Sequence, residues 1–382
     1  MPPSLRRELP LIVAAVAAGI ALPFEHTLAD AGRGVAGIAA AVLVAVILGA
    51  SIRIAHHAEA LAEHVGEPYG TMILTLSAVL LEVVILAIML GHTTSPTLVR
   101  DTIYSAVMLD INALLGLSAL LGGLRHGEQP YNVDSGNTYV VMILTAIGVS
   151  MVLPAFVPVE HWPAYFVFTI ITMVLMYGLF LRLQVGRHSY FFSYAYAQHV
   201  KTSHGGAPAQ VQAQAQAQAQ APATPDRDAP APSVLLLVAT IAIGLLLVGL
   251  LAEVMAATLD AALAGSAVPP IVAPLLVATI SASPEILTAL RAALANRMQP
   301  VVNIALGASL STVILTVPVL EALALFTGHP LHMALTGAQG VMVLLTLLVA
   351  MINIHDGETN AIEGMTHFVL FMAFLMLSAL GL

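Results

Sequence analysis

Long apolar runs recur along almost the whole chain, and short stretches with Gly, Pro or charged residues separate them. Runs of roughly 18 to 25 apolar residues are typical of membrane-spanning helices, because a helix needs about 20 residues to cross the hydrocarbon layer. Division at Gly, Pro and charge predicts eleven spans, near residues 9–24, 35–53, 70–91, 102–123, 139–158, 163–184, 233–258, 269–293, 301–327, 332–353 and 361–381. We therefore expect an all-α polytopic membrane protein.

Composition agrees with this class and excludes several others. The 382 residues are 59% hydrophobic and only 9% charged, whereas a soluble domain has about 25% charged residues. A soluble enzyme is thus excluded, and the continuous apolar runs also exclude a membrane β-barrel, whose strands alternate. The absence of cysteine excludes disulfides and thiolate metal sites. The net charge of −9 provides no basic surface for nucleic acid.

The Lys and Arg residues predict how the chain is oriented, since cytoplasmic loops retain positive charge during insertion. With the N-terminus in the cytoplasm and the C-terminus outside, only Arg33 and Arg100 fall on the outer side. The others fall inside: Arg6, Arg7, Arg53, Arg125, Arg182, Arg187, Lys201, Arg227, Arg291 and Arg297. The lack of cysteine and the Ala-rich bias favour a bacterial inner membrane.

A low-complexity segment divides the chain. Residues 187–232 contain an alternating Ala-Gln tract followed by several prolines, a composition that cannot bury a core. We expect a flexible cytoplasmic linker there. It separates an N-terminal helix and loop (1–34) and a first five-helix repeat (35–186) from a second five-helix repeat (233–382).

The two halves share a local pattern. Ala58-Glu59-Ala60-Leu61-Ala62 resembles Ala252-Glu253-Val254-Met255-Ala256, and each leads through a Gly- or Pro-bearing connection into a span that contains a Glu. Because five is an odd number of spans, the second repeat is expected to be inverted relative to the first. Inverted repeats are typical of transporters whose substrate site lies near the midplane.

Two carboxylates lie inside predicted spans. Glu82 is near the centre of the third span, and Glu285 is slightly past the middle of the eighth. A charge at this depth costs about 3 kcal/mol or more unless it is neutralised, and no Lys or Arg lies in any span interior. We interpret both as cation-binding and proton-binding groups. A carboxyl that serves only packing, either protonated or paired with a buried base, is the alternative.

Pro284 adds to the candidate site around Glu285. Proline cannot donate a hydrogen bond to the carbonyl of Ile280, so that oxygen is expected to be free. Hard oxygen ligands of this kind suit Ca²⁺, and Na⁺ or K⁺ less selectively. A simple helix kink is the alternative. The expected cluster combines the Glu285 carboxylate, the Ile280 carbonyl and the hydroxyls of Thr279, Ser281 and Ser283.

Other polar residues in the spans are candidates for additional ligands or for a proton relay. They are Ser77, Asp110, Asn112, Asn303 and Ser309. For Asp110, a hydrogen bond that packs two helices is an equal alternative. Glu321 lies near the outer end of its span, where an interfacial position is expected.

Acidic residues and histidines are candidates for a cytoplasmic mouth. Histidine titrates near neutral pH, so such a cluster can make transport sensitive to pH. The acidic candidates are Glu59, Glu63 and Glu253, and the histidines are His56, His57 and His64. A solvated connecting segment explains these residues equally well.

Several spaced motifs resemble those of the calcium/cation antiporter superfamily, in particular the calcium/proton antiporters of its cation exchanger branch. The stretch from Ala58 through Glu82 resembles the first signature region, and Ser281 through Pro318 resembles the second. Further matches are Gly122-Gly123, Glu128-Gln129-Pro130-Tyr131-Asn132 and the stretch Asp356 through Gly364. The resemblance implies an eleven-span fold in which Glu82 and Glu285 bind Ca²⁺ and H⁺ competitively.

The sequence departs from this family at two places. Many relatives carry Gly-Asn shortly before each membrane Glu, whereas this chain has Ala78-Val79 and Ser281-Ala282. The acidic stretch between the halves is replaced by the Ala-Gln linker. Loss of two amide oxygens weakens the expectation of Ca²⁺ selectivity.

We therefore expect a secondary antiporter that exchanges cytoplasmic Ca²⁺ for H⁺ and needs no cofactor. Exchange of Na⁺ or K⁺ for H⁺ on the same fold is the nearest alternative, and a cation channel or a structural membrane protein is the alternative of another class. No HExxH or GxSxG motif supports an intramembrane enzyme. The expected partners are the lipid bilayer and inorganic cations, and assembly as a homo-oligomer is left open.

Overall fold

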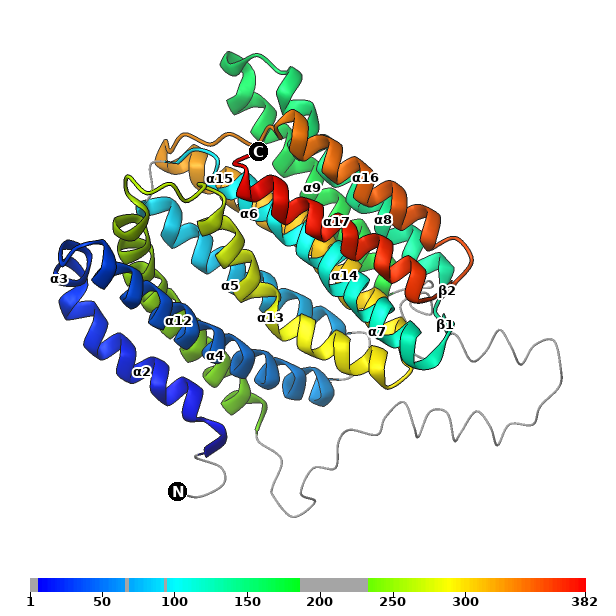
Figure 1. The fold of residues 1–382 in the computed structure, drawn as a ribbon, viewed down its shortest axis with the longest axis horizontal. Helices are drawn as coiled ribbons and strands as arrows, with labels where there is room; N and C mark the ends of the chain where they lie inside the picture. Colours follow the sequence, from blue (N-terminus) through cyan, green and yellow to red (C-terminus); the bar gives the residue numbers. More distant parts are fainter. Residues whose placement is uncertain (1–5, 66–68, 93–94, 186–232) are drawn as a thin grey trace.

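The computed structural model describes residues 6–65, 69–92, 95–185 and 233–382 and is almost entirely helical (Figure 1). The first half contains α2 (Leu9–Ala21), α3 (Glu25–Asp30), α4 (Arg33–Val65), α5 (Tyr69–His92), α6 (Leu98–Val107), α7 (Gly116–His126), α8 (Val133–Ile147) and α9 (Trp162–Val185). The second half contains α12 (Val234–Leu263), α13 (Val272–Leu294), α14 (Met298–Ser311), α15 (Val317–Thr327), α16 (Gly337–Asn353) and α17 (Ala361–Ala379).

Short irregular elements join or interrupt these helices. Three π-helical segments, η2 (Met108–Leu115), η3 (Gly148–Val152) and η7 (Thr312–Thr316), continue α6, α8 and α14. Three 3₁₀ segments are η1 (Leu22–Phe24), η4 (Leu153–Phe156) and η5 (Val159–His161). Strands β1 (Gln129–Pro130) and β2 (Glu358–Thr359) pair antiparallel and join the loops before α8 and α17.

Within the described ranges, nine helical segments are long and apolar enough to cross a membrane, and two shorter apolar helices are Thr75–Gly91 and Gly337–Asn353. The expected class, an all-α polytopic membrane protein, is confirmed. The count of eleven spans, the inverted repeats and the domain boundaries stay predictions. The expected linker at 187–232 lies outside the described residues.

Two predicted spans differ from the structure for local reasons. The second span was expected at 35–53, but α4 continues to Val65 because no Gly or Pro interrupts residues 50–65. The tenth span was expected from residue 332, but α16 begins only at Gly337. Thr336 caps it there, with reciprocal hydrogen bonds between Thr336 and Gln339.

The helices lie side by side (Figure 1). The arginines of the described residues divide unevenly between the two ends of the bundle. We name the end where α2 begins, and where β1 and β2 lie, the arginine-rich end. Arg33 and Arg100 lie instead near the starts of α4 and α6, at the opposite end. The arginine-rich end carries Arg6, Arg7, Arg53, Arg125, Arg182, Arg291 and Arg297.

The N-terminal helix α2 packs against α4 and α12, which also pack against each other along their lengths. At the arginine-rich end, Glu8 accepts hydrogen bonds from Arg53 and from His57 Nε2 at 3.1 Å. Partial burial acts to raise the pKa of Glu8, but the hydrogen bonds and charges of Arg53 and His57 outweigh it and hold the pKa below its usual value. This contact joins α2 to α4.

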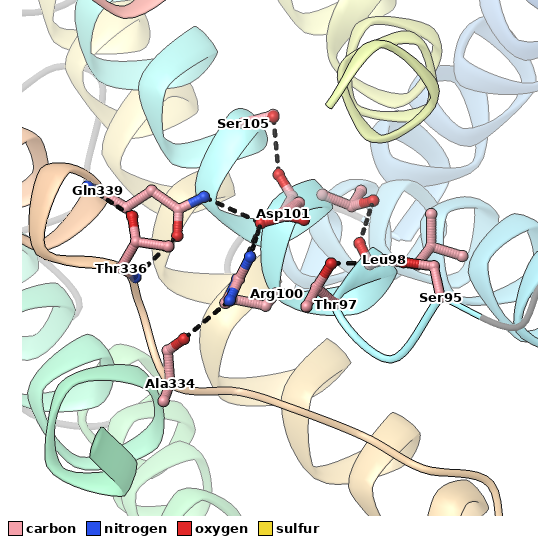
Figure 2. Close-up of polar contacts among 10 residues, drawn as sticks. Ser95, Thr97, Leu98, Arg100, Asp101, Ser105, Ala334, Thr336 and Gln339 are labelled. Atoms are coloured by element: carbon pink, nitrogen blue, oxygen red, sulfur yellow. Dashed lines mark hydrogen bonds and ion pairs between the residues drawn. The ribbon is translucent and has the colours of Figure 1, made fainter. Parts of the chain in front are cut away.

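At the opposite end, a polar network joins the two halves (Figure 2). Arg100 Nη2 lies 2.7 Å from Asp101 Oδ1, which also accepts a hydrogen bond of 2.9 Å from Gln339 Nε2. Arg100 Nη1 donates to the carbonyl of Ala334 at 3.1 Å. The start of α6 is thereby fixed to α16 and to the loop before it.

Candidate functional site

Three carboxylates from different elements line one small cavity inside the bundle. They are Glu82 of α5, Asp110 of η2 and Glu285 of α13. The cavity volume is about 20 Å³, which is room for roughly one water molecule or ion. Glu82 and Glu285 were predicted from their depth in the spans, and the structure places them on the same cavity wall.

Glu82 is almost completely buried, with 2% of its surface exposed. Its Oε2 accepts hydrogen bonds from Thr312 Oγ1 at 2.9 Å and from Thr316 Oγ1 at 3.4 Å. Its Oε1 has no hydrogen-bond partner among the described residues. One oxygen of this buried carboxyl is therefore held in place by η7, while the other is available to a ligand.

Asp110 has the same arrangement. It is 2% exposed, its Oδ2 accepts a hydrogen bond of 3.2 Å from Ser309 Oγ, and its Oδ1 has no partner in the described part of the chain. The side chain reaches the cavity from the π-helical segment η2. Such segments are frequent at functional sites because they alter the direction of neighbouring side chains and backbone groups.

None of the positively charged side chains that the structure describes lines this site. The ion pairs found in the described ranges involve Glu8 and Asp101, and neither residue lines the cavity. Three ionised carboxylates at the site would repel one another in a medium of low dielectric constant, so a cation or protons must accompany them.

The cavity wall includes the positions where the chain departs from the calcium/proton antiporter pattern. Ala78, Val79, Ser281 and Ala282 all line it. Methyl and isopropyl groups therefore face the site where amide oxygens were expected from the resemblance. Ser281 is also a wall residue, but its hydroxyl donates to the carbonyl of Ala278 at 3.0 Å.

A second cavity of about 100 Å³ adjoins the first, and both are lined by Glu285 and Ser281. It extends between α4, α5, α13 and α14 toward the arginine-rich end, where Glu59 lines it. Thr288 Oγ1 donates to Glu59 Oε1 at 3.4 Å. Ser77 and Asn303 also line this second cavity, so both candidates lie beside the site rather than at its carboxylates.

The oxygen cluster expected around Pro284 is not assembled. Helix α13 continues through Pro284, and the hydroxyl of Ser283 donates to the carbonyl of Ile280 at 2.9 Å. The oxygen freed by the proline is thus satisfied within its own helix. Thr279 is exposed on the outside of the bundle and donates to Leu275 at 2.7 Å. Among these candidates, only Ser281 and Glu285 line the carboxylate cavity.

Asn112 does not line either cavity. Its Nδ2 donates to Thr346 Oγ1 at 2.7 Å, and its Oδ1 lies 3.1 Å from Nδ1 of the buried His367. Asn112 therefore joins η2 to α16 and α17, a packing role. The participation of His367 was missed, because a single histidine in an apolar helix carries no signal of its partner.

The expected mouth residues are divided between several places. His57 pairs with Glu8, while His56 and His64 contact carbonyls of their own helix, and Glu63 is exposed. Glu253 was assigned to the same mouth wrongly. Helix α12 runs antiparallel to α4, so Glu253 lies ~15 Å from the Leu263 end of its helix, which is near Arg33.

Two features of α15 and η7 were not anticipated. Thr316 was not expected at the site, although its spacing of four residues from Thr312 places both hydroxyls on one helix face. Glu321 was expected at an interface, but it is completely buried. Its surroundings are set by α9, which packs on α15.

Among the residues that the structure describes, no group of three or more His, Asp or Glu side chains is arranged to hold a metal ion. The three carboxylates nevertheless line one cavity.

Known proteins resemble the chain along most of its length. The family model described as sodium/calcium exchanger protein matches residues 35–186 and 236–380. The sodium-potassium/proton antiporter ChaA of Escherichia coli (strain K12) is 32% identical over 334 residues, which cover 86% of each chain. A Ca²⁺/H⁺ antiporter of Aphanothece halophytica is 23% identical over 290 residues, covering 73% of this chain and 74% of that relative.

A solved structure shares the fold. Native YfkE superposes with a TM-score of 0.70 at 17% sequence identity, and the match covers 97% of this chain and 99% of that chain. At this identity the likeness concerns the arrangement of helices and not the transported ion.

Proposed function

Because the chain belongs to the sodium/calcium exchanger protein family, a family of cation exchangers and not of catalytic enzymes, we propose that it is a proton-coupled cation antiporter. Glu82, Asp110 and Glu285 bind the cation and protons in competition. The observation that carries this proposal is the ion-sized cavity lined by three carboxylates that no described cationic side chain accompanies.

The mechanism follows from electrostatics. With no ligand, ionised carboxylates that line one buried cavity are costly, since no described positive side chain compensates them. Either a cation or protons remove this cost. The coupling follows if only a neutralised site can switch between the inward-open and outward-open states. Each switch then carries either the cation or protons across the membrane, so one is exchanged for the other.

The second cavity supplies the access route. We assign the arginine-rich end to the cytoplasm, because positive charge stays on that side during insertion. The cavity then leads from Glu59 at the cytoplasmic side to Glu285 at the site. In this assignment the structure is a state that faces the cytoplasm of a bacterial cell, and the inward proton gradient drives cation export.

Ca²⁺ is the proposed cargo. Three carboxylates can balance a divalent cation, whose interaction with each of them is twice that of a monovalent ion at the same distance. Hydroxyls of Ser281, Ser311 and Thr312 on the same wall provide further oxygen atoms.

Na⁺ or K⁺ is the second candidate, and the apolar part of the cavity wall supports it. Ala78, Val79 and Ala282 place apolar groups where Ca²⁺ would require oxygen ligands to complete a shell of about 6 to 8. The similarity to a sodium-potassium/proton antiporter agrees with this alternative.

Transport by the purified full chain in liposomes tests the proposal. Ca²⁺, Na⁺ and K⁺ are offered separately under an imposed pH gradient, and a pH dye inside the vesicles reports proton movement. We expect cation movement that requires the gradient and is abolished in Glu82→Gln and Glu285→Gln. Cation flux that does not depend on the pH gradient would favour a channel. Full activity of both variants would contradict the proposed site. Elution of the variants at the wild-type volume in size-exclusion chromatography serves as the check that they are folded.

A further inference from the structure

Glu321 of α15 is a buried carboxyl that lies outside the candidate site. Its exposed fraction is 0%, and neither Oε1 nor Oε2 has a hydrogen-bond partner in the described part of the chain. No ion pair of the described residues involves it. It does not line the carboxylate cavity or the cavity beside it.

An ionised carboxylate with no partner is disfavoured in such surroundings, so the Glu321 side chain holds a proton in this state. Packing alone does not call for a carboxyl group. A leucine or methionine of similar volume would fill the space without two unsatisfied oxygens. The position therefore carries a titratable group at a cost in stability.

The place of Glu321 along its helix relates it to the site. Thr312 and Thr316 of η7 donate to Glu82, and Glu321 follows five residues after Thr316. With a rise of ~1.5 Å and a turn of about 100° per residue, it lies ~7.5 Å beyond Thr316 along the axis, about 140° around the helix from it, and ~9 Å before Thr327, where α15 ends. That end is opposite to the arginine-rich end, toward which the larger cavity extends.

In the described part of the chain, few ionisable groups lie on the elements that pack against Glu321. Helix α15 packs against α9, α5 and η7. On α9, Tyr165 lies within electrostatic range of Glu321, and its hydroxyl donates to the carbonyl of Val149 at 2.7 Å. Among the described side chains of α5, Glu82 is ionisable and buried, and its Oε1 is without a partner. Segment η7 contributes hydroxyls only.

We propose that Glu321 is a proton-binding site that passes protons between the outer surface and Glu82, a role that rests on the proposed antiport. The O–H proton of Glu321 transfers, through intervening water, to the carboxylate of Glu82 as the cation leaves. Glu321, now ionised, takes up a proton from the outer side. One proton moves in each step, and no other group changes its charge.

The test separates proton transfer from cation binding. Purified full-length wild type, Glu321→Gln and Glu321→Asp are compared in liposomes, with Glu160→Gln, an exposed glutamate at the same end, as the matched control. One assay follows cation flux driven by a pH gradient. The other follows isotope self-exchange of the transported cation, with ⁴⁵Ca²⁺ as the first tracer, at equal pH on both sides, which needs no net proton movement.

We expect Glu321→Gln to slow proton-coupled flux by about 100-fold, the low end of what a positioned proton-transfer group contributes. Self-exchange stays within twofold of wild type. Glu321→Asp, which keeps a carboxyl, recovers part of the coupled flux, and Glu160→Gln behaves as wild type. Unchanged coupled flux in Glu321→Gln overturns the inference. Equal loss of both activities in Glu321→Gln overturns it as well, since proton transfer would not be the affected step.

A second readout does not depend on transport. Infrared spectra of Glu321→Gln should lack one carbonyl band of a protonated carboxylic acid that wild type and Glu160→Gln show at neutral pH. A spectrum identical to wild type contradicts a protonated Glu321. If wild type moves cations without moving protons, the proposed antiport is wrong. If wild type couples the two movements normally and Glu321→Gln does as well, only the role of Glu321 is wrong.

Discussion

The hydroxyl of Thr312 donates a hydrogen bond of 2.9 Å to Oε2 of Glu82, and 230 positions of sequence separate the two residues. The contact joins η7 in the second half of the chain to α5 in the first half. Segment η7 contributes no carboxyl to the cavity, but its Thr312 orients the buried carboxyl of Glu82.

Thr312→Val should weaken cation binding while leaving the fold intact. The valine keeps the shape of the side chain but removes the donor, and a hydrogen bond to a charged group contributes about 1.5 to 3 kcal/mol. We expect the KM for the cation to rise about tenfold, which corresponds to ~1.4 kcal/mol. Thr327→Val is the matched control, because Thr327 is exposed and donates only to Leu323 of its own helix. Equal KM values for the two variants would refute a role of Thr312.

Asp110→Asn should affect divalent and monovalent cations unequally. The substitution keeps the shape and the acceptor for Ser309 but removes one negative charge, and the lost Coulomb energy scales with the charge of the bound ion. We expect the loss of binding free energy to be about twice as large for Ca²⁺ as for Na⁺. Isothermal titration of the purified protein measures both. Asp134→Asn, at an exposed position, serves as control. Unchanged affinities for both ions would remove Asp110 from the site.

The contact of Glu8 with Arg53 and His57 should make stability depend on pH. Burial opposes the ionised form, but the hydrogen bonds and charges of Arg53 and His57 hold the pKa of Glu8 below its ordinary value of 4.5 in the folded state. The contact therefore stabilises the fold above pH 4.5 and loses its effect as the pH falls through the lowered pKa. Because Glu8 is about one third exposed, the contribution is below about 1 kcal/mol.

Thermal unfolding of detergent-solubilised wild type and Glu8→Gln measures this effect. We expect wild type to have the higher Tm at pH 7 and the difference to shrink as the pH is lowered past 4.5. A difference that grows on acidification would show that Glu8 is not held in its ionised form.

Gly364→Ala should destabilise the packing of α17 on α7. A Cβ atom at Gly364 would lie 2.1 Å from the backbone nitrogen of Leu120 and 2.7 Å from the carbonyl oxygen of Gly116. Backbone atoms of a packed helix cannot move aside cheaply, so we expect a loss of about 1 to 3 kcal/mol or more. Gly19→Ala is the control, since no atom lies within 4 Å of the added methyl group. A Tm equal to that of the control variant would contradict this close approach.

The sequence by itself determined the class of the protein and singled out two of the three carboxylates that line the cavity. The length of an apolar helix that crosses a bilayer is set by the bilayer, so the spans can be located from local composition. A carboxylate within such a run is costly wherever its helix faces, which is why Glu82 and Glu285 could be singled out without a structure.

Only the tertiary structure decided which side chains meet. A helix that is apolar on all sides has no polar face, so the pattern does not reveal which way Asp110, Asn112 or Thr279 points. Asp110 reaches the cavity, Asn112 binds Thr346, and Thr279 faces outward.

The same limit applies to the groups around Pro284 and Glu321. The sequence shows that the carbonyl of Ile280 lacks its backbone donor. It does not show that the Ser283 hydroxyl donates to this carbonyl, because that hydrogen bond depends on the rotamer of Ser283. The burial of Glu321 depends on α9, a helix more than 130 positions away along the chain. Local composition predicts how often the chain crosses the membrane, whereas the neighbours of each side chain arise from helix packing between distant segments.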